Sequence, residues 1–349
     1  MNTKRRIKRI RNKLKETDTC NSQQNGHNMG IEEGFSIFIQ SKTNENLKER
    51  TISDHKKHFE YFTKYLYKFK PHIKRIKDIS IQDINDYISY MKNAKRCWDD
   101  HCDLKNVSER IGLKSTTINI RLRTLKAQFR FWYRKGYITD DIAKEITLLK
   151  EDKVDFKAFK KEHIKRILAQ IEFNSKYTEF RDYVLIYLLI DTGARINHLL
   201  SLKMENINFI TRTFTLEADK SKIREDTVYS FTGRTGQWLK KLVEYNRSNL
   251  QITNGFVFMT IEGKQYKADT FRKRLKDYGK KANVPSDIKI TPHSFRHFYA
   301  TDAYEKGASL LELKSLLKHK CLEATMRYIH DDVDHYRKTH NQYSPVHNF

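Results

Sequence analysis

The sequence predicts a mainly helical protein with a small antiparallel β-sheet, an α+β fold, and three observations support this prediction. Apolar residues recur at about 3.6-residue spacing through most of residues 31–140, which is typical of amphipathic helices. Two short β-favouring runs, RTFTLEA and DTVYSF, flank the charged segment DKSKIRE and therefore predict a hairpin. A third short run, GFVFM, is expected to join this sheet before the chain returns to helical patterns.

Length and charge limit the possible partners. The chain has 349 residues, and 68 Lys and Arg stand against 43 Asp and Glu, a net charge of +25. A single core rarely grows to this size, so we expect two domains. The positive charge favours an extended polyanion, and nucleic acid before a membrane. The sequence contains neither an apolar run of the roughly 18 residues that a bilayer span needs nor the apolar core of a secretory signal. We therefore expect a cytoplasmic protein with no membrane partner.

The four cysteines predict no disulfide framework, and reduced thiols are expected. The stretch CWDDHC brings Cys97, His101 and Cys102 close together, but no second pair of ligands follows nearby. We expect an inserted loop or helix end there, and no metal site.

The domain organisation follows from changes in composition. Residues 1–30 carry eight Lys or Arg in the first fifteen positions, followed by a polar stretch, and are expected to form a disordered basic tail. A helical domain over 31–150 and a charged linker over 151–158 precede a second domain at 159–335. Residues 336–349 remain as a C-terminal tail.

Four helical segments are expected in the first domain. One begins near Phe35, and the next is TISDHKKHFEYFTKYLYKF, for which Thr51 is the expected N-cap. ISIQDINDYISYM follows, and then TTINIRLRTLKAQFRFWYRKG, where Gly136 suits a C-terminal cap. The fourth segment carries basic residues that we expect to contact phosphates, although a solvated face is an equal alternative: Arg121, Arg123, Lys126, Arg130 and Arg134.

The second domain is expected to begin with two helices, EHIKRILAQIEF and the apolar FRDYVLIYLLIDTGAR, which ends near Gly193. Near its end, Thr291 and Pro292 mark a helix start, with Thr as the cap and Pro in the first turn. This start places His293 and Arg296 on one face, three residues apart.

A second helix should begin at the capping-box pair Ser309 and Glu312 and place His319 at its end, with Tyr328 on a third short helix. Each of these residues alone has an ordinary structural explanation. Together with Arg195 in TGARINHLLSL, however, they form a recognisable set.

Three stretches resemble, in order and spacing, the motifs of the tyrosine recombinase, or phage integrase, family. They are TGARINHLLSL, HSFRHFYAT and LLKHKCLEATMRYIH. The resemblance covers roughly residues 160–330, and it identifies 159–335 with the family's catalytic domain. The helical region before it is similar in kind to the family's SAM-like core-binding domain. Two positions depart from the family pattern: Lys318 stands where glycine is usual, and His198 where glutamate is common.

The resemblance implies a site-specific recombinase that cuts DNA through a 3′-phosphotyrosyl intermediate. Tyr328 would be the nucleophile, and Arg195 and Arg296 would bind the non-bridging phosphate oxygens. His293 and His319 would orient the phosphate and move the tyrosine proton. Lys220 in the hairpin turn would protonate the 5′ oxygen, with Lys222 as the alternative. No cofactor, ATP or metal is implied.

The expected partners are double-stranded DNA and three further copies of the chain, because such enzymes act as tetramers on two DNA sites. The C-terminal tail would dock into a neighbouring protomer, and accessory DNA-bending or partner recombinase proteins would assist. Two alternatives share the sequence features: a type IB topoisomerase-like relaxing enzyme, and a non-catalytic DNA-binding protein with the same fold. The target site and the choice among integration, excision, transposition and dimer resolution stay open at this stage.

Overall fold

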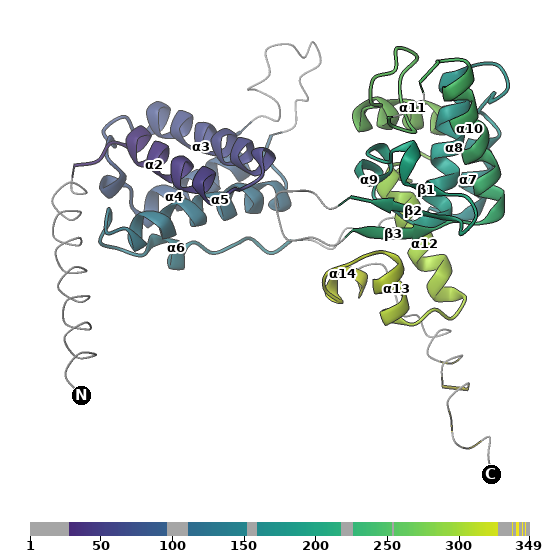
Figure 1. Cartoon of the computed structure of the whole chain (residues 1–349). Helices are drawn as coiled ribbons and strands as arrows, with labels where there is room; N and C mark the ends of the chain where they lie inside the picture. The colour runs from purple at the N-terminus through teal and green to yellow at the C-terminus, as the bar shows by residue number, and fades with distance from the viewer. Residues whose placement is uncertain are drawn as a thin grey trace, which may run out of the picture. The chain divides into compact units, whose positions relative to one another are not determined.

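The computed structural model describes residues 28–95, 111–151, 159–217, 226–252 and 255–326, with positions 337, 340, 341, 344 and 346. The chain divides into two compact units, Met1–Val154 and Asp155–Phe349 (Figure 1). The N-terminal unit is helical in its described part, and the C-terminal unit combines helices with a three-stranded antiparallel sheet. The predicted α+β class is confirmed. The Cys97–Cys102 stretch and the hairpin turn at 220–222 lie outside the described residues.

The N-terminal unit packs its helices around one apolar core. Phe38, Phe62 and Trp132 are almost fully buried in it, and the Trp132 indole donates a 2.8 Å hydrogen bond to the carbonyl of Gly34. The helices are α2 (Ile31–Asn44), α3 (Glu49–Phe69), the 3-10 helix η1 (Ile76–Asp78), α4 (Ile81–Asn93), α5 (Ser115–Arg134) and α6 (Ile142–Glu145).

Local rules account for some of these helix ends. Gly136 has φ 73°, the left-handed conformation expected just after a helix, so the predicted cap of α5 is confirmed. The predicted N-cap of α3 is wrong: Lys48 is the cap and Thr51 lies inside the helix. Its first turn begins at Glu49, an acidic residue that suits the positive end of the helix dipole.

The C-terminal unit is built around α8 (Tyr177–Thr192), which packs between α10 (Gly233–Ser248) and α12 (Pro292–Glu305). Most side chains of α8 are buried, which explains why its sequence is apolar on nearly every face. The remaining helices are α7 (Lys161–Leu168), α9 (Ile196–Leu200), η2 (Met204–Asn206), α11 (Ala268–Lys281), α13 (Leu310–Leu316) and α14 (Glu323–Met326).

The sheet has the order β1–β2–β3, with strands Ile207–Asn208, Thr213–Leu216 and Thr227–Ser230. β2 and β3 pair antiparallel with Phe214 opposite Tyr229, as the predicted hairpin requires. The predicted third strand is wrong. GFVFM forms only isolated bridges at Phe256 and Met259, and β1 takes the third place in the sheet. Val257, Phe258 and Met259 of that run are buried in the core, which explains its strand-like composition.

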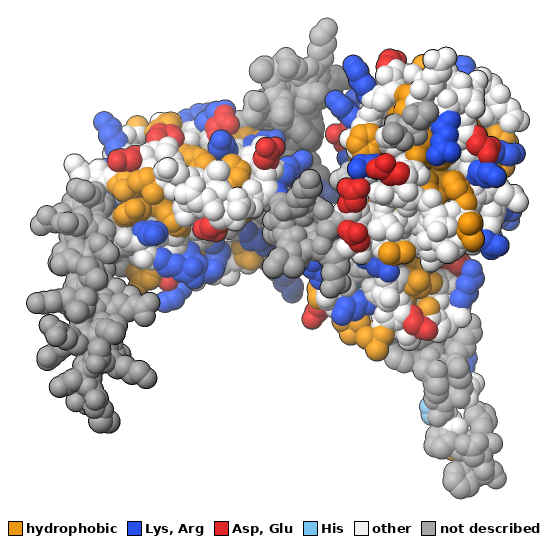
Figure 2. All heavy atoms as spheres, in the orientation of Figure 1, with side chains coloured by type: hydrophobic (Ala, Val, Ile, Leu, Met, Phe, Trp, Pro, Cys, Tyr) orange, Lys and Arg blue, Asp and Glu red, His pale blue; other side chains and the backbone are white. Residues whose placement is uncertain are grey.

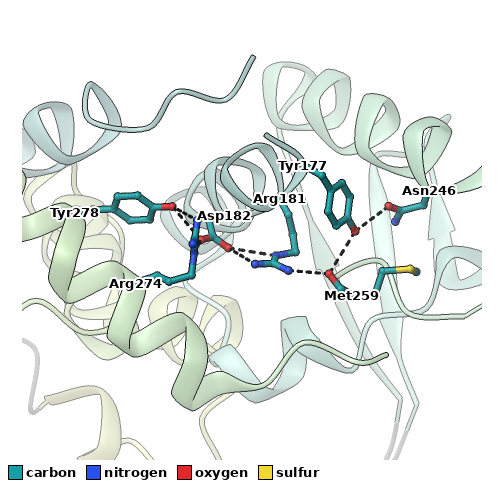
Figure 3. Close-up of polar contacts among 7 residues, drawn as sticks. All are labelled: Tyr177, Arg181, Asp182, Asn246, Met259, Arg274 and Tyr278. Atoms are coloured by element: carbon teal, nitrogen blue, oxygen red, sulfur yellow. Dashed lines mark hydrogen bonds and ion pairs between the residues drawn. The ribbon is translucent and has the colours of Figure 1, made fainter. Parts of the chain in front are cut away.

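A buried polar network fixes α8 inside the C-terminal unit (Figure 3). The carboxylate of Asp182 is fully buried and accepts hydrogen bonds from Arg181 at 3.1 and 3.2 Å, from the Tyr278 hydroxyl at 3.1 Å, and from Arg274. Arg181 also donates to the carbonyl of Met259 at 2.9 Å. These bonds join α8 to α11 and to the 255–259 segment. The turn that follows α8 therefore begins from a fixed position.

Candidate active site

The turn after α8 carries the first predicted site residue, Arg195. Gly193 ends the helix with φ 59°, and a Cβ there would lie 2.5 Å from the ring of Tyr299, so only glycine fits. The Thr192 hydroxyl accepts a 3.2 Å hydrogen bond from the amide of Ala194 and further holds the turn. Arg195 is the N-cap residue of α9, and its side chain is exposed.

The N-terminus of α12 carries two further predicted site residues, His293 and Arg296, as expected. Thr291 caps the helix by accepting the amide of Ser294, and Pro292 occupies the first turn. His293 is exposed, whereas Arg296, one turn later on the same face, is only 2 % exposed. A buried guanidinium needs hydrogen-bond partners, because it is always charged.

Arg296 obtains these partners from two loops. It donates at 2.6 Å to the carbonyl of Gly193 and at 2.6 Å to the carbonyl of Leu317. Its Nη2 also lies 2.7 Å from Nε2 of His319. This one side chain therefore joins the turn after α8, the end of α13 and the predicted histidine, and its guanidinium is held in a fixed orientation.

The contacts of His319 define its protonation. Burial, followed by the charges of Arg296, Arg195 and His293, lowers its pKa to about 4, so the ring is neutral near pH 7. A guanidinium can only donate, so Nε2 accepts from Arg296 and the proton is on Nδ1. Nδ1 then donates to the Thr325 hydroxyl at 2.9 Å. Thr325 was not singled out from the sequence, where an isolated threonine carries no distinguishing signal.

His293 lies in the same positive environment. Although its side chain reaches solvent, partial desolvation by the surrounding atoms, followed by the charges of Arg296, Lys289 and Arg195, lowers its pKa, so it too favours the neutral form. Arg195 contributes to the pKa shifts of both histidines, which places it within electrostatic reach of Arg296 and His319. Four of the six residues that the sequence grouped, Arg195, His293, Arg296 and His319, therefore gather around one positively charged site.

Tyr229 on β3 is a further residue at this site that the sequence did not indicate. It is buried, and its hydroxyl has no hydrogen-bond partner within the described part of the chain. Burial raises its pKa, and the charges of Arg296 and Arg195 oppose that rise. The phenol therefore lies beside the two arginines as a protonated group.

The two departures from the family pattern have clear places in the structure. Lys318 adopts φ 53°, the left-handed conformation that favours glycine, and its ammonium lies 5.9 Å from the centroid of the Tyr229 ring. His198 is half-buried in α9, and its carbonyl accepts the Ser201 hydroxyl at 2.9 Å. Lys318 thus adds a cation near the site while keeping the backbone path of a glycine.

The structure does not test every predicted residue. Lys220, Lys222 and Tyr328 lie outside the described residues. The five basic residues of α5 are in the N-terminal unit and differ in surroundings. Arg130 and Arg134 are exposed, Arg123 lies 3.4 Å from Glu151, Lys126 donates to the carbonyl of Ile146 at 2.6 Å, and Arg121 is buried.

Membrane-spanning helices and metal-binding clusters are both absent from the described residues. None of the helices in that part of the chain is both long and apolar enough to cross a bilayer. Nor do its His, Cys, Asp and Glu side chains gather in threes where they could hold a metal ion.

The domain thus buries an arginine against a neutral histidine, with a second arginine and histidine beside them, an arrangement that suits an anionic substrate. A family model described as "Phage integrase family" matches residues 157–335. The chain therefore belongs to the phage integrase family, the tyrosine recombinases. It is a DNA strand transferase, and its function is site-specific DNA recombination.

Individual relatives agree with this assignment. Tyrosine recombinase XerD of Staphylococcus aureus is 28% identical over 279 residues, which cover 76% of this chain and 90% of the relative. XerD of Staphylococcus epidermidis is 26% identical over 277 residues, with the same coverage of 76% and 90%.

Solved structures show the same fold. A structure of the Tn1549 transposon integrase in complex with a circular intermediate DNA has a TM-score of 0.69 at 17% identity, covering 90% of this chain and 99% of that one. A lambda integrase dimer bound to a core site has a TM-score of 0.66 at 16% identity, covering 87% and 99%.

Proposed function

We propose that this recombinase cuts and rejoins double-stranded DNA through a 3′-phosphotyrosyl bond to Tyr328. The observation that carries the proposal is the fixed guanidinium of Arg296, which two backbone carbonyls and a neutral histidine hold beside the exposed Arg195. Two guanidiniums can stabilise the charge that gathers on the non-bridging oxygens during phosphoryl transfer, and that of Arg296 is already held in place for this role.

The histidines have distinct roles in this proposal. His319 is neutral near pH 7, with its proton on Nδ1 and its Nε2 turned to Arg296, so it can orient the guanidinium and accept a proton once the arginine engages the phosphate. His293 at the start of α12 lies beside the same charges and helps to hold the phosphate. Lys220, or Lys222, donates the proton to the departing 5′ oxygen.

The balance of the reaction explains why a tyrosine is needed. The Tyr328 oxygen gives up its proton to one of the two histidines and forms a bond to phosphorus while the bond to the 5′ oxygen breaks, and that oxygen leaves as a hydroxyl with the lysine's proton. In the return step, a 5′ hydroxyl of the partner strand attacks the phosphotyrosyl bond and releases the phenol. The energy of the phosphodiester is retained, so the proposed reaction uses neither ATP nor a cofactor.

We further propose the finer assignments that follow from this activity. Four copies act on two DNA sites in the cytoplasm, each gripping the duplex with a core-binding domain over 31–150 and the catalytic domain over 159–335. The 336–349 segment docks into a neighbouring copy, and a mobile genetic element supplies the sites. The similar solved structures support DNA as the partner, since the Tn1549 integrase is in complex with DNA and the lambda integrase dimer is bound to a core site.

The decisive experiment traps the covalent intermediate. The substrate is a nicked suicide DNA that carries the junction of the mobile genetic element. It is incubated with the enzyme, and the covalent protein–DNA adduct is detected on a denaturing gel. Tyr328→Phe should still bind this DNA but form no adduct, because only the hydroxyl is lost. Tyr304→Phe, a half-buried tyrosine on α12, is the matched control and should form the adduct normally. An adduct that persists in Tyr328→Phe would refute the nucleophile.

The leaving-group proton is tested separately. Lys220→Ala should fail on an ordinary substrate but cleave one whose 5′-bridging oxygen is replaced by sulfur, because a thiolate leaves without protonation. Selective rescue of Lys222→Ala instead would move the role to Lys222, and rescue of neither would place the proton donor elsewhere. We expect cleavage to continue in EDTA.

A further inference from the structure

Lys318 occupies an unusual backbone position directly before His319. Helix α13 ends in a Schellman motif, in which the amide of Lys318 donates to the carbonyl of Ser315 at 3.1 Å and the amide of His319 donates to that of Lys314 at 3.0 Å. The residue after the cap of such a motif takes the left-handed conformation, and Lys318 does so with φ 53°. Glycine adopts this conformation without strain, so the lysine side chain is present at a cost in stability.

The backbone conformation alone does not indicate a function, because four other non-glycine residues of the described ranges share it. What distinguishes Lys318 is its place in the candidate active site. Arg296 bonds to both of its chain neighbours, to the carbonyl of Leu317 at 2.6 Å and to the ring of His319 at 2.7 Å. The exposed side chain of Lys318 therefore starts from a backbone that is held beside the buried guanidinium.

The ring of Tyr229 on β3 gives the Lys318 ammonium a defined position. This ring is buried and stacks on Phe214 of β2, with centroids 5.3 Å apart. The Nζ of Lys318 lies 5.9 Å from the centroid of the Tyr229 ring, within the range of a cation–π interaction. Because both the strand pairing and the stacking fix the ring, it is a rigid support for a flexible side chain.

Tyr229 also brings the lysine into the electrostatic environment of the two arginines. Burial raises the pKa of Tyr229, and the charges of Arg296 and Arg195 oppose that rise, so both guanidiniums lie within electrostatic reach of the ring. Three cations are therefore close to one ring, and their mutual repulsion is relieved when an anion lies among them. Figure 2 shows further Lys and Arg side chains over the surface of α12 to α14, which add to the attraction for a polyanion.

We propose that Lys318 is a further catalytic residue, whose ammonium binds the phosphate undergoing transfer, and that Tyr229 positions it. An ammonium offers three N–H donors, and beside two guanidiniums it adds to the stabilisation of the charge that develops on the non-bridging oxygens. The family pattern has glycine at this position, so the added cation is a property of this chain's own sequence. The inference rests on the proposed phosphate clamp of Arg195 and Arg296.

The first experiment compares cleavage rates of the full-length chain on the nicked suicide DNA at saturating enzyme. Lys318→Gln keeps a non-glycine residue at this backbone position but removes the charge. Its rate should fall by about tenfold or more, the effect of losing a charge-assisted hydrogen bond. Lys318→Arg keeps a cation that also stacks on aromatic rings, and it should retain most of the rate.

Two controls separate this role from stability and from net charge. Lys318→Gly suits φ 53° better and should still cleave about tenfold more slowly, so the loss cannot be attributed to a weakened fold. Lys306→Gln removes an exposed cation just after the end of α12, about 20 Å along the helix from His293 at 1.5 Å per residue. It should leave the rate unchanged, and an equal loss there would assign the effect to net charge and overturn the proposal.

Tyr229 is tested through its coupling to Lys318. Tyr229→Leu removes the ring and should lower the rate, and adding Lys318→Gln to it should then cost much less than tenfold, because both changes remove one interaction. Tyr229→Phe keeps the ring, so Lys318→Gln should still cost about tenfold in that background. If the losses of Tyr229→Leu and Lys318→Gln add in full, Tyr229 contributes only to the fold and its positioning role is wrong.

Three outcomes would overturn the assignment of Lys318. An unchanged rate in Lys318→Gln beside an active wild type would refute it and leave the phosphotyrosyl mechanism intact. A weaker affinity for the DNA with an unchanged rate at saturation would place Lys318 on a neighbouring phosphate instead of the one transferred. A wild type that forms no adduct at all would overturn the proposed function together with this inference.

Discussion

The two active-site arginines should respond differently to the same substitution, because one is buried and the other exposed. Arg296→Gln would leave the carbonyls of Gly193 and Leu317 and the Nε2 of His319 competing for one amide group. The amide supplies only two N–H donors, so at least one buried acceptor loses its donor, and the free energy of unfolding should fall by about 1–3 kcal/mol. For a unit of this size, that loss lowers the melting temperature by about 2–12 °C.

Arg195→Gln is the matched control, since the same chemical change occurs at an exposed N-cap residue. Its free energy of unfolding should stay within about 0.5 kcal/mol of the wild type. Both variants should lose at least about 100-fold in cleavage rate, because each removes a donor to the developing phosphate charge. Scanning calorimetry and the suicide-substrate assay measure the two effects separately. Equal melting temperatures for the two variants would refute the reasoning that Arg296 joins the loops of the site.

Three further predictions concern stability. Lys318→Gly should raise the melting temperature slightly, because φ 53° costs a non-glycine residue about 1 kcal/mol, and Lys318→Val should lower it. His319 has its pKa lowered in the folded state, so the unfolded chain binds more protons below pH 6.5, and denaturant titrations should show stability falling from there toward about 4, less steeply in His319→Gln. Asp182→Ala leaves two arginines without their shared carboxylate and should reduce the free energy of unfolding by about 3–5 kcal/mol. Removal of the surface carboxylate in Asp302→Ala should change it by less than about 0.5 kcal/mol.

The sequence by itself determined the elements whose signals are local. Apolar residues at helical spacing predicted the helices, and Thr291, Ser309 and Gly136 mark helix ends because caps depend only on neighbouring backbone groups. The predicted cap at Thr51 is wrong because a residue that suits a cap can also lie inside a helix. Here the helix already begins at Glu49. The motif order also indicated the family, because the chemistry requires those residue types.

The run GFVFM shows that local composition cannot distinguish a strand from another buried segment. Its apolar, β-favouring composition fits a strand, but the same composition fits any fully buried segment, and the choice depends on which backbone lies alongside. In the folded unit, β1 occupies the sheet edge, and GFVFM packs into the core with isolated bridges.

Only the tertiary structure decided how the site residues work. The sequence treats Arg195 and Arg296 alike, yet long-range packing leaves one exposed and buries the other against two carbonyls that are 103 and 21 residues away in the chain. The tautomer of His319 follows from that contact, and Tyr229 joins the site because hairpin pairing brings β3 beside the arginines. Burial and hydrogen-bond partners are properties of non-local contacts, so residue type and spacing could name the catalytic set but could not assign its charges and protons.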